Sequence, residues 1–152
     1  MSAAKIAYIQ AGWHAEITDG CKKAFIEEIG RQGYDGSDVE FFTVPGSLEI
    51  PLISKKLAST GRYLAVCASG LVVDGRIYRH EFVAQAVIDG LVRVSLETGV
   101  PVLSAVLTPQ HFHEHEAHHR FFEEHMFVKG KELAEACGAI IRTVAAIERV
   151  ED

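Results

Sequence analysis

The feature that most constrains the fold of this 152-residue chain is a set of four short apolar runs. Each run is followed along the chain by a segment with apolar residues at helical spacing. The runs predict strands over Lys5–Ala11, Val39–Val44, Tyr63–Ala68 and Val100–Leu107. The segments between them predict helices over about Ala15–Gln32, Leu48–Ser59 and Glu81–Thr98, with a last helix from about Lys131. Because parallel crossovers need a dozen or more residues, we expect an α/β fold with a four-stranded parallel sheet and helices on both faces.

The composition is that of one globular domain spanning residues 1–152, with 48% apolar and 24% charged residues. No apolar run approaches the roughly 20 residues of a membrane span, and the N-terminus lacks the pattern of a signal peptide. Cys21, Cys67 and Cys137 each lie in an apolar periodic segment, which predicts buried free thiols. We therefore expect a cytoplasmic protein.

The net charge of −6, without a stripe of clustered Lys and Arg, argues against a nucleic-acid partner. It does not exclude a small anionic substrate, because a few converging cations dominate the field at contact distance. Gly70–Val83 is the best candidate for such a site. Here a strand ending near Ala68 meets a helix through a glycine-bounded loop that carries Arg76, Arg79 and His80, and helix N-termini bind anions.

Three other residues lie where a ligand could bind. Trp13 follows the first strand, where it either stacks on a flat heterocycle or anchors its own loop. Glu49 lies at the start of a helix, where it either binds a ligand or only complements the helix dipole. Lys129 precedes the last predicted helix, where it is either solvated or faces the same rim of the sheet as the Gly70 loop.

Six of the eight histidines fall between His111 and His125. Pairs such as His111 and His115 have the i,i+4 spacing of a helical zinc site. The same segment also fits a solvated helical face, or a supply of histidines to an anionic pocket. Because no cysteine lies nearby and the ligand set is not closed, we predict no metal site.

Four motifs together resemble the lumazine synthase family in order and spacing: Val44–Pro51 (Val-Pro-Gly-Ser-Leu-Glu-Ile-Pro), Gly70–Val83, Val100–Thr108 and Val128-Lys129-Gly130. The Tyr78-Arg79-His80 run and the segment from His111 to Glu114 resemble the divergent second type of that family. The resemblance implies a flavodoxin-like core and a pentamer or a dimer of pentamers, with active sites between subunits. It also implies the penultimate step of riboflavin biosynthesis, which needs no cofactor. The implied substrates are 5-amino-6-ribitylaminopyrimidinedione and 3,4-dihydroxy-2-butanone 4-phosphate.

The resemblance also implies roles for individual residues. Trp13 matches the stacking aromatic; Ser47, Leu48 and Glu49 match the ribityl-binding segment; Val72 and Val73 match backbone contacts to the pyrimidine; and Lys129 matches a lysine near the phosphate. Where the family has a phosphate-binding loop threonine, this chain has Gly75, Arg76 and Ile77. The usual phosphate-binding arginine has no clean match, and Arg120 or a histidine is its candidate replacement.

The proton carrier is left open between two neighbours. The family places a histidine two residues before an acidic residue, but here Arg79 holds that register and His80 directly precedes Glu81. Adjacent helical residues point about 100° apart, so we expect only one of the two to face the substrate. Two other functions are possible: a non-catalytic flavin or lumazine carrier on the same fold, and a histidine-rich metal-binding assembly protein.

Overall fold

Strands and helices alternate along the chain, as the apolar pattern predicts. The computed structural model describes residues 4–72, 80–107 and 116–151, and for 80, 81, 107, 116–123, 150 and 151 the backbone alone. The elements in order are β1 (Ile6–Ala11), α1 (Ala15–Arg31), the 3₁₀ turn η1 (Gly36–Asp38), β2 (Val39–Val44), the 3₁₀ turn η2 (Ser47–Glu49), α2 (Ile50–Ala58), β3 (Ala65–Leu71), α3 (His80–Thr98), β4 (Val102–Leu107) and α4 (Glu116–Glu151).

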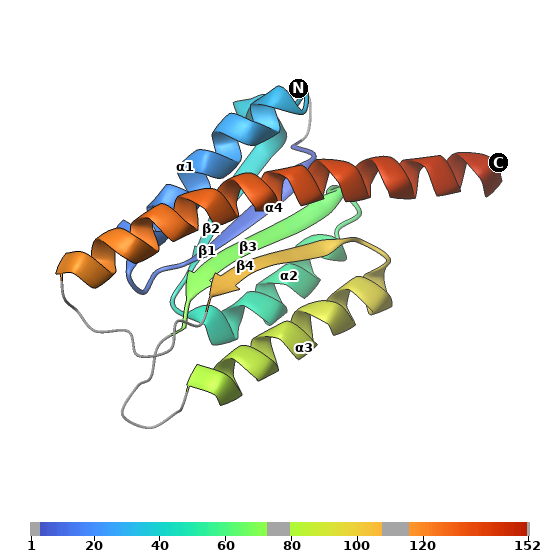
Figure 1. The fold of residues 1–152 in the computed structure, drawn as a ribbon. Coiled ribbons are helices and arrows are strands. Elements are labelled where there is room, and N and C mark those ends of the chain that lie inside the picture. Colours follow the sequence, from blue (N-terminus) through green and yellow to red (C-terminus); the bar gives the residue numbers. More distant parts are fainter. Residues whose placement is uncertain (1–3, 73–79, 108–115, 152) are drawn as a thin grey trace.

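The four strands form one parallel sheet in the order β2-β1-β3-β4. Helices α1 and α4 cover one face of this sheet, and α2 and α3 cover the other (Figure 1). The order matches the first four strands of the flavodoxin-like arrangement. The predicted fold, a three-layer α/β sandwich with a four-stranded parallel sheet, is therefore confirmed.

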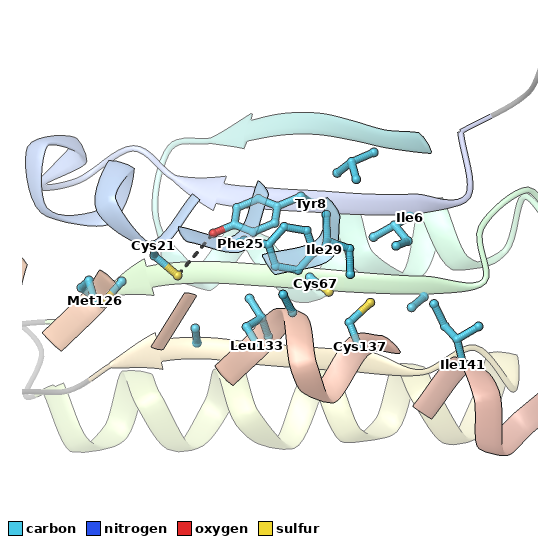
Figure 2. Packing of buried hydrophobic residues seen from close by; sticks show 14 of the residues in the cluster. Ile6, Tyr8, Cys21, Phe25, Ile29, Cys67, Met126, Leu133, Cys137 and Ile141 are labelled. Carbon is cyan, nitrogen blue, oxygen red and sulfur yellow. Dashed lines mark hydrogen bonds between the residues drawn. The ribbon is translucent and has the colours of Figure 1, made fainter. Parts of the chain in front are cut away.

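The two faces of the central strand β1 fill two separate cores. Ile6 and Tyr8 pack under α1 and α4, whereas Ala7 and Ile9 pack under α2 and α3. In the first core the rings of Tyr8 and Phe25 meet edge to face, with centroids 4.9 Å apart (Figure 2). Because both faces of β1 are covered, its sequence is apolar on both faces from Ile6 to Ile9 rather than alternating.

All three cysteines are free and buried, as predicted. Their side chains lie in the core under α1 and α4 (Figure 2). The Tyr8 hydroxyl donates a hydrogen bond to Cys21 Sγ at 3.4 Å. Burial nevertheless raises the pKa of Cys21 to about 11, because desolvation penalises the thiolate more than the hydrogen bond from Tyr8 stabilises it.

We expect thiol reagents to modify the folded protein far more slowly than the unfolded chain. With a pKa of about 11, only about one thousandth of Cys21 is thiolate at pH 8. The rate should therefore rise about tenfold per pH unit toward pH 11, as the thiolate fraction does. Colorimetric thiol titration of native and guanidinium-unfolded protein measures this, and prompt native reaction at pH 8 would contradict the burial.

Strand β3 is longer than the sequence predicts. It continues through Gly70 to Leu71 and stays paired with β4, although the apolar run was expected to end at Ala68 and turn at the glycine. The glycine serves a close approach instead of a turn. A Cβ on Gly70 would lie 2.9 Å from Ser47 Oγ and 3.1 Å from Ala11 Cβ. Only glycine leaves room for these two neighbours.

Helix α4 begins at Glu116, well before the start expected at about Lys131, and runs for 36 residues. Gly130 does not end it, because here too glycine serves a close approach. A Cβ on Gly130 would lie 2.1 Å from the carbonyl oxygen of Cys21, so α4 crosses α1 with its backbone nearly touching. The far end of α4 extends past the sheet (Figure 1). Within the described ranges no helix is long and apolar enough to span a bilayer.

Candidate functional site

The carboxyl ends of the parallel strands share one edge of the sheet, which is where ligands bind in open α/β folds. Strands β1, β2 and β3 end there at Ala11, Val44 and Leu71. The candidate residues Trp13, Ser47–Glu49 and Val72 directly follow these three ends. The topology therefore gathers the predicted pyrimidine and ribityl contacts at a single rim.

Trp13 and Glu49 both lie close to Gly46. The Gly46 N–H donates to Glu49 Oε2 at 3.1 Å. A Cβ on Gly46 would lie 3.2 Å from that oxygen and 3.9 Å from Trp13 Nε1. Trp13 is 64% exposed although it is the largest apolar side chain in the protein. The rim thus presents a flat aromatic surface beside a carboxylate, which suits a planar heterocycle that carries hydroxyl groups.

His14 holds a left-handed backbone conformation (φ 56°, ψ 45°), which the sequence analysis did not predict. Among the described residues it is the only non-glycine with positive φ. Such a conformation costs about 1–2 kcal/mol in a non-glycine residue and clusters at ligand sites. Histidine is enriched in this region of backbone space, which is a weak sequence signal. The His14 carbonyl accepts from the N–H groups of Ile17 and Thr18, and α1 begins at the next residue, Ala15.

The other predicted rim residues divide into exposed and buried side chains. Leu48 is 52% exposed and Glu49 is also exposed, whereas Ser47 is buried against Gly70. The side chain of Val72 is 4% exposed. A buried side chain at this position is compatible with the expected contact through the backbone of Val72.

Lys129 lies in a second location. It lines a groove of about 390 Å³ between the edge strand β4 and helix α4, together with Leu103, Ser104, Ala105, Glu132, Leu133 and Ala136. Its ammonium is 3.0 Å from Glu132 Oε2. That Lys129 faces the Gly70 loop stays a prediction, because residues 73–79 of that loop lie outside the described residues. Since α4 starts at Glu116, Lys129 lies roughly 20 Å along the helix, beside the middle of β4.

The rim and the groove are separated across the sheet. Trp13 and Glu49 follow β1 and β2, whereas the groove follows β4 at the opposite edge from β2. Neighbouring strands lie about 4.8 Å apart, so β4 is about 10–15 Å from β1 and β2. The described residues therefore carry two candidate half-sites, an aromatic one at the rim and a cationic one in the groove beside β4.

The stretch of chain that contains the rim and the groove matches a known protein family. A family model described as 6,7-dimethyl-8-ribityllumazine synthase matches residues 3–145. The chain belongs to the 6,7-dimethyl-8-ribityllumazine synthase family. The match includes both half-sites, from Trp13 to Glu132.

Members of the lumazine synthase family from several bacteria resemble this chain over nearly their whole length. A 6,7-dimethyl-8-ribityllumazine synthase from Rhodococcus erythropolis is 54% identical, covering 94% of this chain and 92% of that protein. A 6,7-dimethyl-8-ribityllumazine synthase 2 from Pseudomonas syringae pv. tomato is 50% identical, covering 97% and 86%. Among solved structures, a diflavin flavoprotein A3 from Nostoc sp. aligns with a TM-score of 0.43 and 12% identity over 95% of this chain and 99% of that chain, a similarity that carries no functional argument.

The remaining residues that the lumazine synthase resemblance implies are not placed at side-chain level. Val73, Gly75, Arg76, Ile77 and Arg79 lie outside the described residues. His80 is the first residue of α3, and Arg120 lies in the first part of α4, where the backbone alone is described. Their proposed roles remain predictions.

The histidine-rich segment is described only in part. His118 and His119 lie in α4, and His125 is an exposed residue of the same helix. His111, His113 and His115 lie outside the described residues. Among the described side chains no group of three or more histidine, cysteine or acidic residues is arranged to hold a metal ion.

Proposed function

We propose that this protein is a lumazine synthase. It condenses 5-amino-6-ribitylaminopyrimidinedione with 3,4-dihydroxy-2-butanone 4-phosphate to give 6,7-dimethyl-8-ribityllumazine. The observation that carries the proposal is the exposed Trp13 ring beside the Glu49 carboxylate, at the rim of a chain that matches the family model from residue 3 to 145. Residues 13 and 49 both lie inside that match.

The rim supplies what the pyrimidine substrate needs. The indole of Trp13 stacks on the planar ring, and stacking of this kind is worth about 1–3 kcal/mol. Glu49 accepts hydrogen bonds from ribityl hydroxyls, with Ser47 and Leu48 beside it. Backbone groups of Val72 and Val73 at the end of β3 contact the polar edge of the pyrimidine. These contacts fix the amine for attack.

The chemistry requires positioning, proton transfer and a phosphate site. The amine attacks the ketone and water leaves to form an imine; phosphate is then eliminated, and the second ring amine closes on the remaining carbonyl with loss of a second water. Well-oriented reactants alone supply about 7–11 kcal/mol of the acceleration. His80 or Arg79 carries protons, and Gly75, Arg76, Ile77, Arg120 and Lys129 hold the phosphate. No cofactor takes part.

The assembly we propose is a pentamer or a dimer of pentamers with active sites between subunits. Two observations support it: the separation of the aromatic rim from the Lys129 groove, and an exposed apolar stripe on α3. Ile88, Val92 and Leu96 follow one another at i,i+4 spacing and are 39%, 53% and 80% exposed. An unpartnered apolar stripe on a soluble domain favours contact with another chain. Sedimentation equilibrium measures the number of subunits.

The three free, buried thiols suit the reducing cytoplasm, where we place the reaction.

The activity is tested by mixing the purified protein with both substrates and following lumazine fluorescence. We expect turnover without added metal or cofactor. Ligand binding without turnover would support the non-catalytic carrier instead, and stoichiometric metal in tag-free protein would support the metal-binding alternative.

The proton carrier is tested by His80→Ala and Arg79→Ala in the same assay. We expect His80→Ala to slow turnover by about 10²-fold or more without abolishing it, because general acid–base help is worth about 10²–10⁴-fold and positioning survives. Full turnover of His80→Ala together with loss in Arg79→Ala would assign the proton transfer to Arg79.

A further inference from the structure

The groove beside β4 contains an ion pair of which the proposed mechanism uses only Lys129. Lys129 and Glu132 are one helical turn apart on α4, and their charged atoms are 3.0 Å apart. Of the described residues that line the groove, these two alone are charged. Lys129 is 34% exposed and Glu132 is 54% exposed, so the ammonium is the more enclosed partner.

An anion that enters this groove meets both charges. The Lys129 ammonium attracts a phosphate, but it already contacts the Glu132 carboxylate. The Glu132 carboxylate repels the incoming phosphate dianion. The carboxylate and the phosphate then either share the Lys129 ammonium, or one of them loses its contact with it. An opposite-charge contact at this exposure is weak, so a phosphate can displace it, at a cost in affinity.

We propose that Glu132 is a positioning residue that holds Lys129 in the groove and competes with phosphate for its ammonium. The inference rests on the proposed function, which assigns Lys129 to the substrate phosphate. Its consequence concerns the end of the reaction. Elimination releases inorganic phosphate into the groove, and Glu132 then recaptures the ammonium and weakens the hold on that product.

The test uses the assembled protein and inorganic phosphate as the probe. Phosphate binding is measured directly by the broadening of its phosphorus NMR line, and also as inhibition against the ketone phosphate substrate. For Glu132→Gln we expect phosphate to bind about 3- to 10-fold more tightly, because the amide keeps the size of the side chain and removes the competing charge. The KM for the ketone phosphate should fall with it.

A matched control lies one turn further along the same helix. Glu135 pairs with Lys131 at 3.9 Å and is 50% exposed, but it does not line the groove. Glu135→Gln changes the net charge by the same amount and should leave phosphate affinity unchanged. Tighter phosphate binding by Glu132→Gln but not by Glu135→Gln would therefore show an effect of the Lys129–Glu132 pair and not of the overall charge.

Lys129→Met separates failure of this inference from failure of the proposed site. If Lys129→Met weakens phosphate binding while Glu132→Gln binds like the wild type or less tightly, the competition is wrong and the phosphate site stands. If Lys129→Met leaves phosphate binding unchanged, Lys129 does not hold phosphate, and both the assignment and the inference are overturned.

Discussion

Mixed assemblies of Trp13→Ala and Lys129→Met subunits are expected to recover about one quarter of the wild-type kcat/KM, which is the share of sites that receive both intact halves at random. Each variant alone should lose about 10- to 100-fold, because stacking and a charge-assisted contact are each worth about 1–3 kcal/mol. The reason is geometric. Trp13 lies at the β1–β2 side of the rim, and Lys129 lies beside the opposite edge strand β4.

Co-expression of the two variants and assay of the purified mixture measure the recovery. The control is a mixture of Trp13→Ala with Glu49→Gln, whose altered residues flank the same glycine and therefore belong to the same half-site. That mixture should not recover. Absence of recovery for Trp13→Ala with Lys129→Met would mean that each subunit completes its own site.

Gly130→Ala is expected to lower the free energy of unfolding by about 3 kcal/mol or more, the largest stability change we expect from a single methyl group. The added Cβ would lie 2.1 Å from the Cys21 carbonyl oxygen. That oxygen belongs to the backbone of α1 and cannot rotate away, so the two helices must separate. Denaturant unfolding at one fixed protein concentration measures the change, since assembly also contributes to stability.

Gly30→Ala is the matched control for this substitution. Gly30 is also a helical glycine, but a Cβ there would meet nothing within 4 Å. The substitution should raise the free energy of unfolding by about 0.5–1 kcal/mol, because alanine favours the helix over glycine. Similar midpoints for both variants would show that α4 does not depend on its close crossing with α1.

The fold was predictable from the sequence because its signals are local. The apolar run of β1 and the helically spaced apolar residues of α1 each lie within one short window, and these residues of α1 are buried: Ile17, Cys21, Ala24, Phe25 and Ile29. Gly70 was misinterpreted, and the last helix was expected to start only after Gly130, for the opposite reason. Glycine is ordinarily a signal for a turn or a helix end, but here Ser47 and Cys21, distant in sequence, require it. No local pattern contains that information.

The candidate site was predictable in its parts but not in its arrangement. The sequence placed Trp13 and Glu49 after neighbouring strands, and parallel topology then brought them to one rim. Glu49 also accepts a hydrogen bond from the Gly46 N–H, so it has a local structural role alongside the proposed ligand role. Lys129 was expected to precede the last helix, but it lies inside α4, because the start of that helix was predicted too late. A polar helical segment whose buried contacts are with α1 shows little apolar periodicity in its own sequence, so its helix is hard to predict.

The strand order has a further consequence for how the chain acquires its structure. No two neighbouring strands form a hairpin: Ile6 of β1 pairs with Val39 and Ala65, and Val66 of β3 pairs with Val102. Each pairing of two strands therefore closes a long loop. The conformational entropy of that loop is lost before the pairing can compensate for the loss. Such topologies fold slowly for their size. During synthesis, both edges of the apolar strand β1 are paired only after β3 has emerged. The nascent chain is therefore most prone to aggregation between the synthesis of β1 and the synthesis of β3.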